Sequence, residues 1–306
     1  VLAYLEDSGY LARAAFIMDK LMYSIGLHGK SFIPMLMGFG CSTPAIMATR
    51  TIEDRNDRLI TILVTPFMSC GARLPVYVML AGAFFSARAG SIIWGLYVLG
   101  IIVAIVSAKL LRTFVLPGRP APFIMELPSY RRPTLRTGLL HMWQKGSIYL
   151  RRAGTFILMG AMVVWLMAAF PAGVEYGSEA SYAGQFGKLL EPLVKPLGFD
   201  WKIAVALFFG FLAKEVVIGS MGVLYGAGEN EVLLSSALQS DPAFSPLVAL
   251  CLMVFTLIYM PCVAALGMTK KETGSWGWTA FAATFSTGLA WIMTFLVYRL
   301  GLAIGI

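Results

Sequence analysis

Hydrophobic residues fill most of this chain in long stretches that are separated by short polar segments. Residues 91–111 contain a single charged side chain, Lys109, near the end of the stretch. A helix of about 20 apolar residues crosses the roughly 30 Å hydrocarbon core of a bilayer. Further stretches of similar length are 147–170, 201–225, 247–267 and 279–304. The pattern predicts an all-α, polytopic helical membrane bundle.

The hydrophobic segments fall into two similar triplets, joined by the single segment 147–170. The triplets comprise 31–49, 59–83 and 91–111, and then 201–225, 247–267 and 279–304. Gly38-Phe39 and Gly210-Phe211 interrupt the first segment of each triplet, and PFMSC (66–70) and YMPC (259–262) interrupt the second. We interpret the triplets as two copies of one unit, each containing a broken or re-entrant helix, with the polar loop 226–246 inserted in the second copy.

The distribution of charge indicates how the segments are oriented. Nine of the 24 basic residues lie between Lys109 and Arg152, against one acid, Glu126. Short loops with this bias usually face the cytoplasm, and no aromatic motif accompanies the charge to suggest nucleic acid binding. The loops 226–246 and 268–278 take the sides that their charges favour only if 201–225 returns to its starting side. Treating 31–49 in the same way makes the two copies inverted, as is common in secondary transporters.

The remaining composition agrees with a membrane protein. Hydrophobic residues make up 58% of the 306 positions and charged residues 13%, which is too few charges for a soluble domain of this length. The first 30 residues lack a signal peptide, and their helical apolar spacing predicts an interfacial helix. Since no initiator Met is present, we expect an internal fragment of a longer protein.

The expected organisation follows from these patterns. In chain order it is an interfacial amphipathic helix (1–30), a first repeat (31–111), a basic cytoplasmic loop (112–146), a connecting transmembrane helix (147–170), an external loop (171–200) and a second repeat (201–306).

The residues most suited to chemistry lie at the helix interruptions. Unpaired backbone cannot face lipid, so each interruption is expected to be buried or to line a cavity. Cys41 and Cys70 follow breaks in the first repeat. If the segment is helical at Cys70, Arg73 shares its face and favours its thiolate. Cys262 follows Pro261, and Glu215 is a costly charge at about 3 kcal/mol within a membrane segment.

These four residues, Cys41, Cys70, Cys262 and Glu215, could supply thiolate and carboxylate ligands to one transition metal. The softness of the ligands does not choose among Fe(II), Zn(II) and Cu(I). Simple helix kinks, small buried cysteines and a structural Glu215–Arg73 ion pair remain as alternatives. Gly29–Ser31 is not a complete phosphate loop, because residue 24 is serine where the motif needs glycine.

Several of these motifs resemble a known family. They are GFGCSTPAIMATRTIEDRNDRLIT, PFMSCGARLPVY, GFLAKEVVIGSMGVLY, YMPCVAALG and KKETGSWGWTAF. Together they are similar to the membrane region of the bacterial ferrous iron transport protein B family, from Leu5 to about Phe281. The resemblance implies two gate-type repeats and Fe(II) uptake through the bacterial inner membrane. It places Cys41, Cys70 and Cys262 at the family's proposed pathway cysteines, and Glu215 in the AKE motif of the second gate.

The resemblance also implies partners outside this chain. Family members carry an N-terminal cytosolic GTPase domain, so GTP and Mg²⁺ would act only through a domain that we expect this chain to lack. The chain itself is therefore expected to be a transporter part and not an enzyme. Membrane lipids and a small cytosolic accessory protein are expected partners, nucleic acid is not, and a homo-oligomer is compatible with the resemblance. A nucleoside-type or other small-solute carrier of the gate fold is the alternative, and a thiol oxidoreductase using Cys251 and Cys262 is a third hypothesis.

Overall fold

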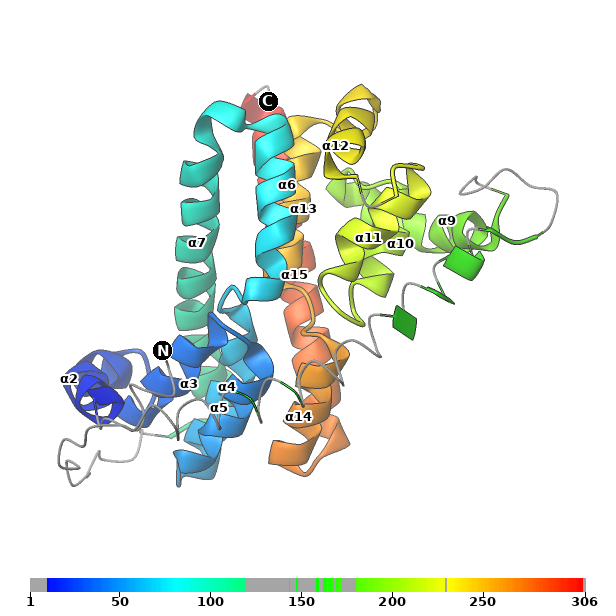
Figure 1. Cartoon of the computed structure of the whole chain (residues 1–306). Helices are drawn as coiled ribbons and strands as arrows, with labels where there is room; N and C mark the ends of the chain where they lie inside the picture. Colours follow the sequence, from blue (N-terminus) through cyan, green and yellow to red (C-terminus); the bar gives the residue numbers. More distant parts are fainter. Residues whose placement is uncertain are drawn as a thin grey trace. The chain divides into compact units, whose positions relative to one another are not determined.

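The chain is all-α in the computed structural model, which describes residues 10–118, 180–228 and 230–304 together with scattered positions between 143 and 171. No strand occurs among these residues, which confirms the predicted class. The helices, labelled in Figure 1, are α2 (Tyr10–Ser24), α3 (Phe32–Gly38), α4 (Ser42–Ala48), α5 (Arg55–Val64), α6 (Leu74–Phe84), α7 (Ala89–Leu110), α9 (Tyr182–Val194), α10 (Trp201–Phe209), α11 (Val216–Leu224), α12 (Glu231–Ser240), α13 (Pro246–Ile258), α14 (Val263–Thr273) and α15 (Trp276–Ile304).

Four helical stretches in the described part of the chain are long and apolar enough to cross a membrane. They are Arg55–Phe84, Ser86–Val115, Pro246–Thr273 and Trp276–Ile304. Each contains one of the predicted segments 59–83, 91–111, 247–267 and 279–304. Most residues of the predicted connecting helix at 147–170 and of the basic loop at 112–146 lie outside the described residues.

The other two predicted segments are each divided into a pair of short helices. Segment 31–49 forms α3 and α4, and segment 201–225 forms α10 and α11. None of these four helices exceeds nine residues, so none crosses a bilayer by itself. The two members of each pair also pack against one another. The broken helix that the sequence predicts for each repeat is therefore present in both.

The chain divides into two compact units. Unit 1 consists of residues 1–70, 99–153 and 265–279, and unit 2 consists of residues 71–98, 154–264 and 280–306. Unit 1 thus contains both Arg112, where the predicted basic loop begins, and the last turn of α14, with Lys270 and Lys271. The charge distribution assigns these two regions to the same side of the membrane.

In unit 1, α5 begins at Arg55 because Asp54 caps it. The Asp54 carboxylate accepts a hydrogen bond from the Asp57 amide (2.8 Å), which satisfies one of the unpaired N–H groups at the helix start. The Ser31 and Thr61 hydroxyls are hydrogen-bonded at 2.8 Å, and both side chains are buried. This contact fixes the start of α3 against the side of α5.

In unit 2, α10 is held between α9 and α11. Asp200 caps α10 by accepting from the Ile203 amide (2.9 Å), and Ser181 caps α9 by accepting from the Gly184 amide (3.1 Å). A Cβ atom at Gly187 would lie 2.7 Å from the Trp201 carbonyl oxygen, so the close approach of α9 and α10 requires glycine there. Helix α6 packs against α13 in the same unit.

The two repeats also agree in how much of each long helix is buried. In the most apolar window, 72% of the residues are buried in both Arg55–Phe84 and Pro246–Thr273, against 22% in both Ser86–Val115 and Trp276–Ile304. The second long helix of each repeat therefore exposes the apolar side chains that a helix facing lipid would expose. Two unrelated halves would not be expected to share both the order of their elements and this pattern of burial.

Candidate functional site at the helix breaks

Each of the four predicted ligand residues lies immediately before the start of a helix. Cys41 is the N-cap of α4, with extended backbone (φ −156°, ψ 128°), and Glu215 is the N-cap of α11. Cys262 precedes Val263, the first residue of α14, and Cys70 precedes the 3₁₀ turn Gly71–Arg73 that leads into α6. The sequence indicated that the three cysteines follow breaks, and the structure adds that each of the four residues marks the point where a helix begins.

The break in unit 1 spans residues 39–41. The amides of Gly40 and Cys41 both donate to the Met37 carbonyl, at 3.0 and 3.1 Å, which closes the end of α3. A Cβ atom at Gly38 would lie 2.9 Å from Met68 Cβ and 3.2 Å from the Thr65 carbonyl oxygen. The end of α3 therefore packs directly on the second break of the repeat, where Thr65–Phe67 forms a 3₁₀ turn.

Unit 2 repeats this arrangement between residues 210–215 and 259–262. The Val263 amide donates to the Phe211 carbonyl (3.1 Å), and Lys214 Nζ donates to the Met260 carbonyl (2.8 Å). A Cβ atom at Gly210 would lie 2.6 Å from Tyr259 Oη and would also overlap Val217. In both repeats, a glycine at the end of the first helix permits one break to pack on the other.

The predicted ligands are divided evenly between the units: Cys41 and Cys70 belong to unit 1, and Glu215 and Cys262 to unit 2. Across the described residues, no three His, Cys, Asp or Glu side chains are grouped closely enough to hold a metal ion. The four cysteines are reduced thiols; Cys251 is fully buried within α13, and the other three are half-buried. A ligand set that combines all four residues remains a prediction.

The condition for one expectation about Cys70 is not met. Arg73 was expected to share a face with Cys70 if the segment is helical there. Met68 instead has extended backbone (φ −64°, ψ 128°), and no helix runs through Cys70. Pro66 lies in the 3₁₀ turn before this segment and cannot donate an amide hydrogen to continue a helix. Arg73 itself is almost fully buried, at 1% exposure.

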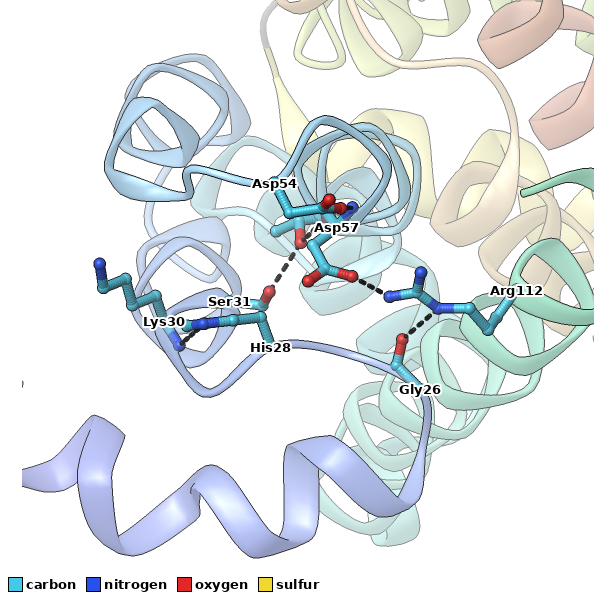
Figure 2. Close-up of polar contacts among 8 residues, drawn as sticks. Gly26, His28, Lys30, Ser31, Asp54, Asp57 and Arg112 are labelled. Carbon is cyan, nitrogen blue, oxygen red and sulfur yellow. Dashed lines mark hydrogen bonds and ion pairs between the residues drawn. The ribbon is translucent and has the colours of Figure 1, made fainter. Parts of the chain in front are cut away.

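The sequence did not reveal a polar cluster in unit 1 that Figure 2 shows. Arg112 is ion-paired with Asp57 through Nη2 and donates from Nε to the Gly26 carbonyl (2.9 Å). Asp57 is completely buried, and Arg112 nearly so. The cluster joins the connection between α2 and α3 to the start of α5 and to the helical turn after α7. No distinct signal in the sequence marked the pair, because Asp57 lies in the charged run EDRNDR (53–58) and Arg112 resembled the other residues of the basic loop.

His28 belongs to the same cluster and is buried. Its Nδ1 accepts a hydrogen bond from the Lys30 amide (3.0 Å; Figure 2), which protonation at Nδ1 would remove. Burial lowers the pKa of His28 below its usual 6.5, although the nearby Asp57 opposes this shift. The unfolded state therefore binds this proton more readily than the folded state does.

We expect the protein to lose stability as the pH falls below about 6.5, where an unfolded histidine is protonated. The melting temperature in detergent should decrease between pH 7.5 and pH 5.5, and less so in His28→Asn, whose amide oxygen can accept from the same backbone N–H without titrating. His141→Asn, at the only other histidine, serves as the control. An unchanged pH dependence in His28→Asn would contradict this role.

Membrane-length helices and two repeats, each containing a broken helix, define a polytopic helical membrane protein. Residues 1–84 and 150–276 match the family model described as Gate, nucleoside recognition, and residues 93–145 match the ferrous iron transport protein B C terminus. The chain therefore belongs to the ferrous iron transport protein B family and corresponds to its membrane part.

Curated relatives agree with this assignment. The Fe(2+) transporter FeoB of Methanocaldococcus jannaschii is 44% identical over 309 residues, covering 98% of this chain and 46% of that protein. The Fe(2+) transporter FeoB of Campylobacter jejuni is 44% identical over 310 residues (96% and 50%). A Porphyromonas gingivalis protein named as a fusion of Fe(2+) transport protein A and FeoB is 44% identical over 347 residues (98% and 41%). The chain thus spans half or less of the length of these relatives, and no solved structure matches it.

Proposed function

We propose that this chain is the permease core of a ferrous iron uptake system, and that Fe(II) passes the broken helices on ligands from Cys41, Cys70, Cys262 and Glu215. One observation carries the proposal: each of these residues directly precedes a helix that begins after a break. Sulfur and oxygen donors are thus concentrated at the positions where helical hydrogen bonding is interrupted.

Helix ends supply a physical reason for this placement. The positive end of a helix dipole stabilises an anion, and the thiolate and carboxylate forms are the ones that bind metal. Backbone carbonyls at the preceding helix ends carry partial negative charge and can coordinate a cation, as unwound segments do in transporters. Because the relatives are named as Fe(2+) transporters, we assign Fe(II) and not Zn(II) or Cu(I) as the transported ion.

Iron uptake by cells that express the full-length protein containing this chain tests the proposal. Cys41→Ser, Cys70→Ser, Cys262→Ser and Glu215→Gln are each expected to lower the initial rate of iron-55 uptake by about tenfold or more, since the loss of a ligand should weaken metal binding at least as much as the loss of a supporting residue. Cys251→Ser is the matched control, because this cysteine lies inside an uninterrupted helix. Variants that are expressed normally and take up iron at the parental rate would contradict the ligand assignment.

We also propose lipid contact for the N-terminal helix α2. Its side chains Ile17, Leu21 and Tyr23 are exposed, Ile17 to 77%, whereas Ala15 and Met22 are buried. A helix with one face on the protein and an apolar face uncovered suits the interface of a bilayer. This agrees with the interfacial helix predicted from residues 1–30.

Further partners follow from the family. We propose that GTP and Mg²⁺ act through a GTPase domain of the full-length protein, that a small cytosolic accessory protein assists transport, and that the system works in the inner membrane. The Porphyromonas gingivalis relative, whose name joins Fe(2+) transport protein A to FeoB, supports the accessory protein.

The family description favours one second candidate, a nucleoside-type carrier, because the matching model is described by nucleoside recognition. The two proposals differ in what competes with iron. Excess uridine or adenosine should leave iron-55 uptake unchanged if the chain carries Fe(II), whereas competition would favour the nucleoside carrier.

A further inference from the structure

Lys214 is a buried cation at the place where the two breaks of unit 2 meet. Lys214 belongs to the first break, residues 210–215. Its Nζ donates to the carbonyl of Met260 (2.8 Å), which belongs to the second break, residues 259–262. The same Nζ lies 3.0 Å from the centre of the Tyr259 ring. Only 3% of the residue is exposed. A strongly hydrated ammonium group is costly to bury unless the protein replaces its water contacts.

The groups around this ammonium form a site that favours positive charge. Helix α13 ends at Ile258, so the Met260 carbonyl lies just beyond the negative end of the helix dipole. The face of an aromatic ring attracts a cation as well. A carbonyl oxygen and a ring face are neutral, and they would also accept an inorganic cation in place of the ammonium group.

Two of the proposed iron ligands adjoin this site along the chain. Glu215 follows Lys214 directly, and Cys262 lies two residues after Met260. The hydrogen bond from the Val263 amide to the Phe211 carbonyl (3.1 Å) fixes the same two segments against each other. A metal ion held by Glu215 and Cys262 would therefore be bound by the same two segments that Lys214 already connects.

We propose that Lys214 is a tethered cation that occupies the Met260 carbonyl in the resting protein and is displaced when Fe(II) passes. Lys214 then acts as a positioning and gating residue: it closes the two breaks on each other, and its charge opposes metal binding until the ion displaces it. Displacement frees the Met260 carbonyl to serve as an additional oxygen ligand. This inference rests on the proposed iron pathway and adds a control element to it.

The test is the affinity of purified, full-length protein for Fe(II), measured by anaerobic calorimetry. Lys214→Gln retains a hydrogen-bond donor but removes the charge, so it is expected to tighten the Kd for Fe(II) by about tenfold or more, because one repulsive charge near a divalent ion is lost. Lys214→Arg keeps the charge and should bind Fe(II) as weakly as the parent. Lys271→Gln, at an exposed lysine in the last turn of α14, is the control for charge removal.

A merely structural role for Lys214 predicts the opposite sign, because a loosened site binds metal more weakly. A folded Lys214→Gln protein with unchanged or weaker Fe(II) binding would therefore overturn the proposal. If that variant does not fold, reductive methylation of the unaltered protein provides a second measurement. Lys214 should become modified faster when Fe(II) is present, and equal labelling with and without Fe(II) would count against displacement.

Failure of this inference can be distinguished from failure of the iron pathway. If the Cys41, Cys70, Cys262 and Glu215 variants lose iron uptake while Lys214→Gln binds Fe(II) like the parent, only the tethered cation is excluded. If those ligand variants transport iron normally, the pathway itself is wrong.

Discussion

Arg112→Met is expected to lower the free energy of unfolding by about 3–5 kcal/mol, because it leaves the buried Asp57 carboxylate without its ion-pair partner. The substitution also removes the donor to the Gly26 carbonyl, so the connection before α3 loses its attachment to the turn after α7. Thermal unfolding of the purified full-length protein in detergent, monitored by circular dichroism, measures the effect. We expect a melting temperature well below that of the parent.

Two further variants distinguish the effect of the unpaired buried charge from a general loss of stability. Lys30→Met breaks an exposed ion pair with Glu53 a short distance away and should have little effect, because solvent screens that pair. The double variant Arg112→Met/Asp57→Leu removes both charges and should recover much of the stability lost by Arg112→Met. If the loss of stability in the double variant equals the sum of the losses in Arg112→Met and Asp57→Leu, the two side chains do not act as a pair.

This cluster also illustrates what the sequence could not reveal. Arg112 lies 55 residues from Asp57 and 86 from Gly26 along the chain, and no local pattern connects positions that far apart. Charge counting assigned Arg112 to a solvent-facing loop, since arginine near the end of a membrane helix is usually exposed. Its burial depends on tertiary packing that brings three segments of unit 1 together.

The helix breaks were predictable because their signals are local. Glycine and proline change the backbone at their own positions, so Gly38 and Gly210 mark the interruptions without reference to the rest of the fold. Helical spacing did not place Arg73 relative to Cys70, because no helix runs through Cys70 after Pro66. Local signals also could not predict that Lys214 would reach the Met260 carbonyl, 46 residues away, because that contact depends on how two breaks pack.

The glycine at the end of α10 should tolerate no side chain. A Cβ atom at Gly210 would overlap Val217 and lie 2.6 Å from Tyr259 Oη and 3.0 Å from the Ala206 carbonyl oxygen. Gly210→Ala must therefore move the segment 210–215 away from residues 259–262, and overpacking of this kind costs about 1–3 kcal/mol. The hydrogen bonds that join Phe211 to Val263 and Lys214 to Met260 would lengthen, and we expect a large loss of iron-55 uptake together with a lower melting temperature.

Gly219→Ala is the matched control, because it makes the same chemical change a short distance away in α11. No atom lies within 4 Å of a Cβ placed there, apart from the immediate surroundings of its own helix. Alanine is favoured over glycine inside a helix by roughly 0.5–1 kcal/mol, so this variant should be at least as stable as the parent and should transport iron normally.

Gly38→Ala extends the test to the first repeat, where a Cβ would lie 2.9 Å from Met68 Cβ. If the two repeats use the same contact between breaks, Gly38→Ala should resemble Gly210→Ala and not Gly219→Ala; normal uptake by both break variants would mean that close packing of the breaks is not needed for transport.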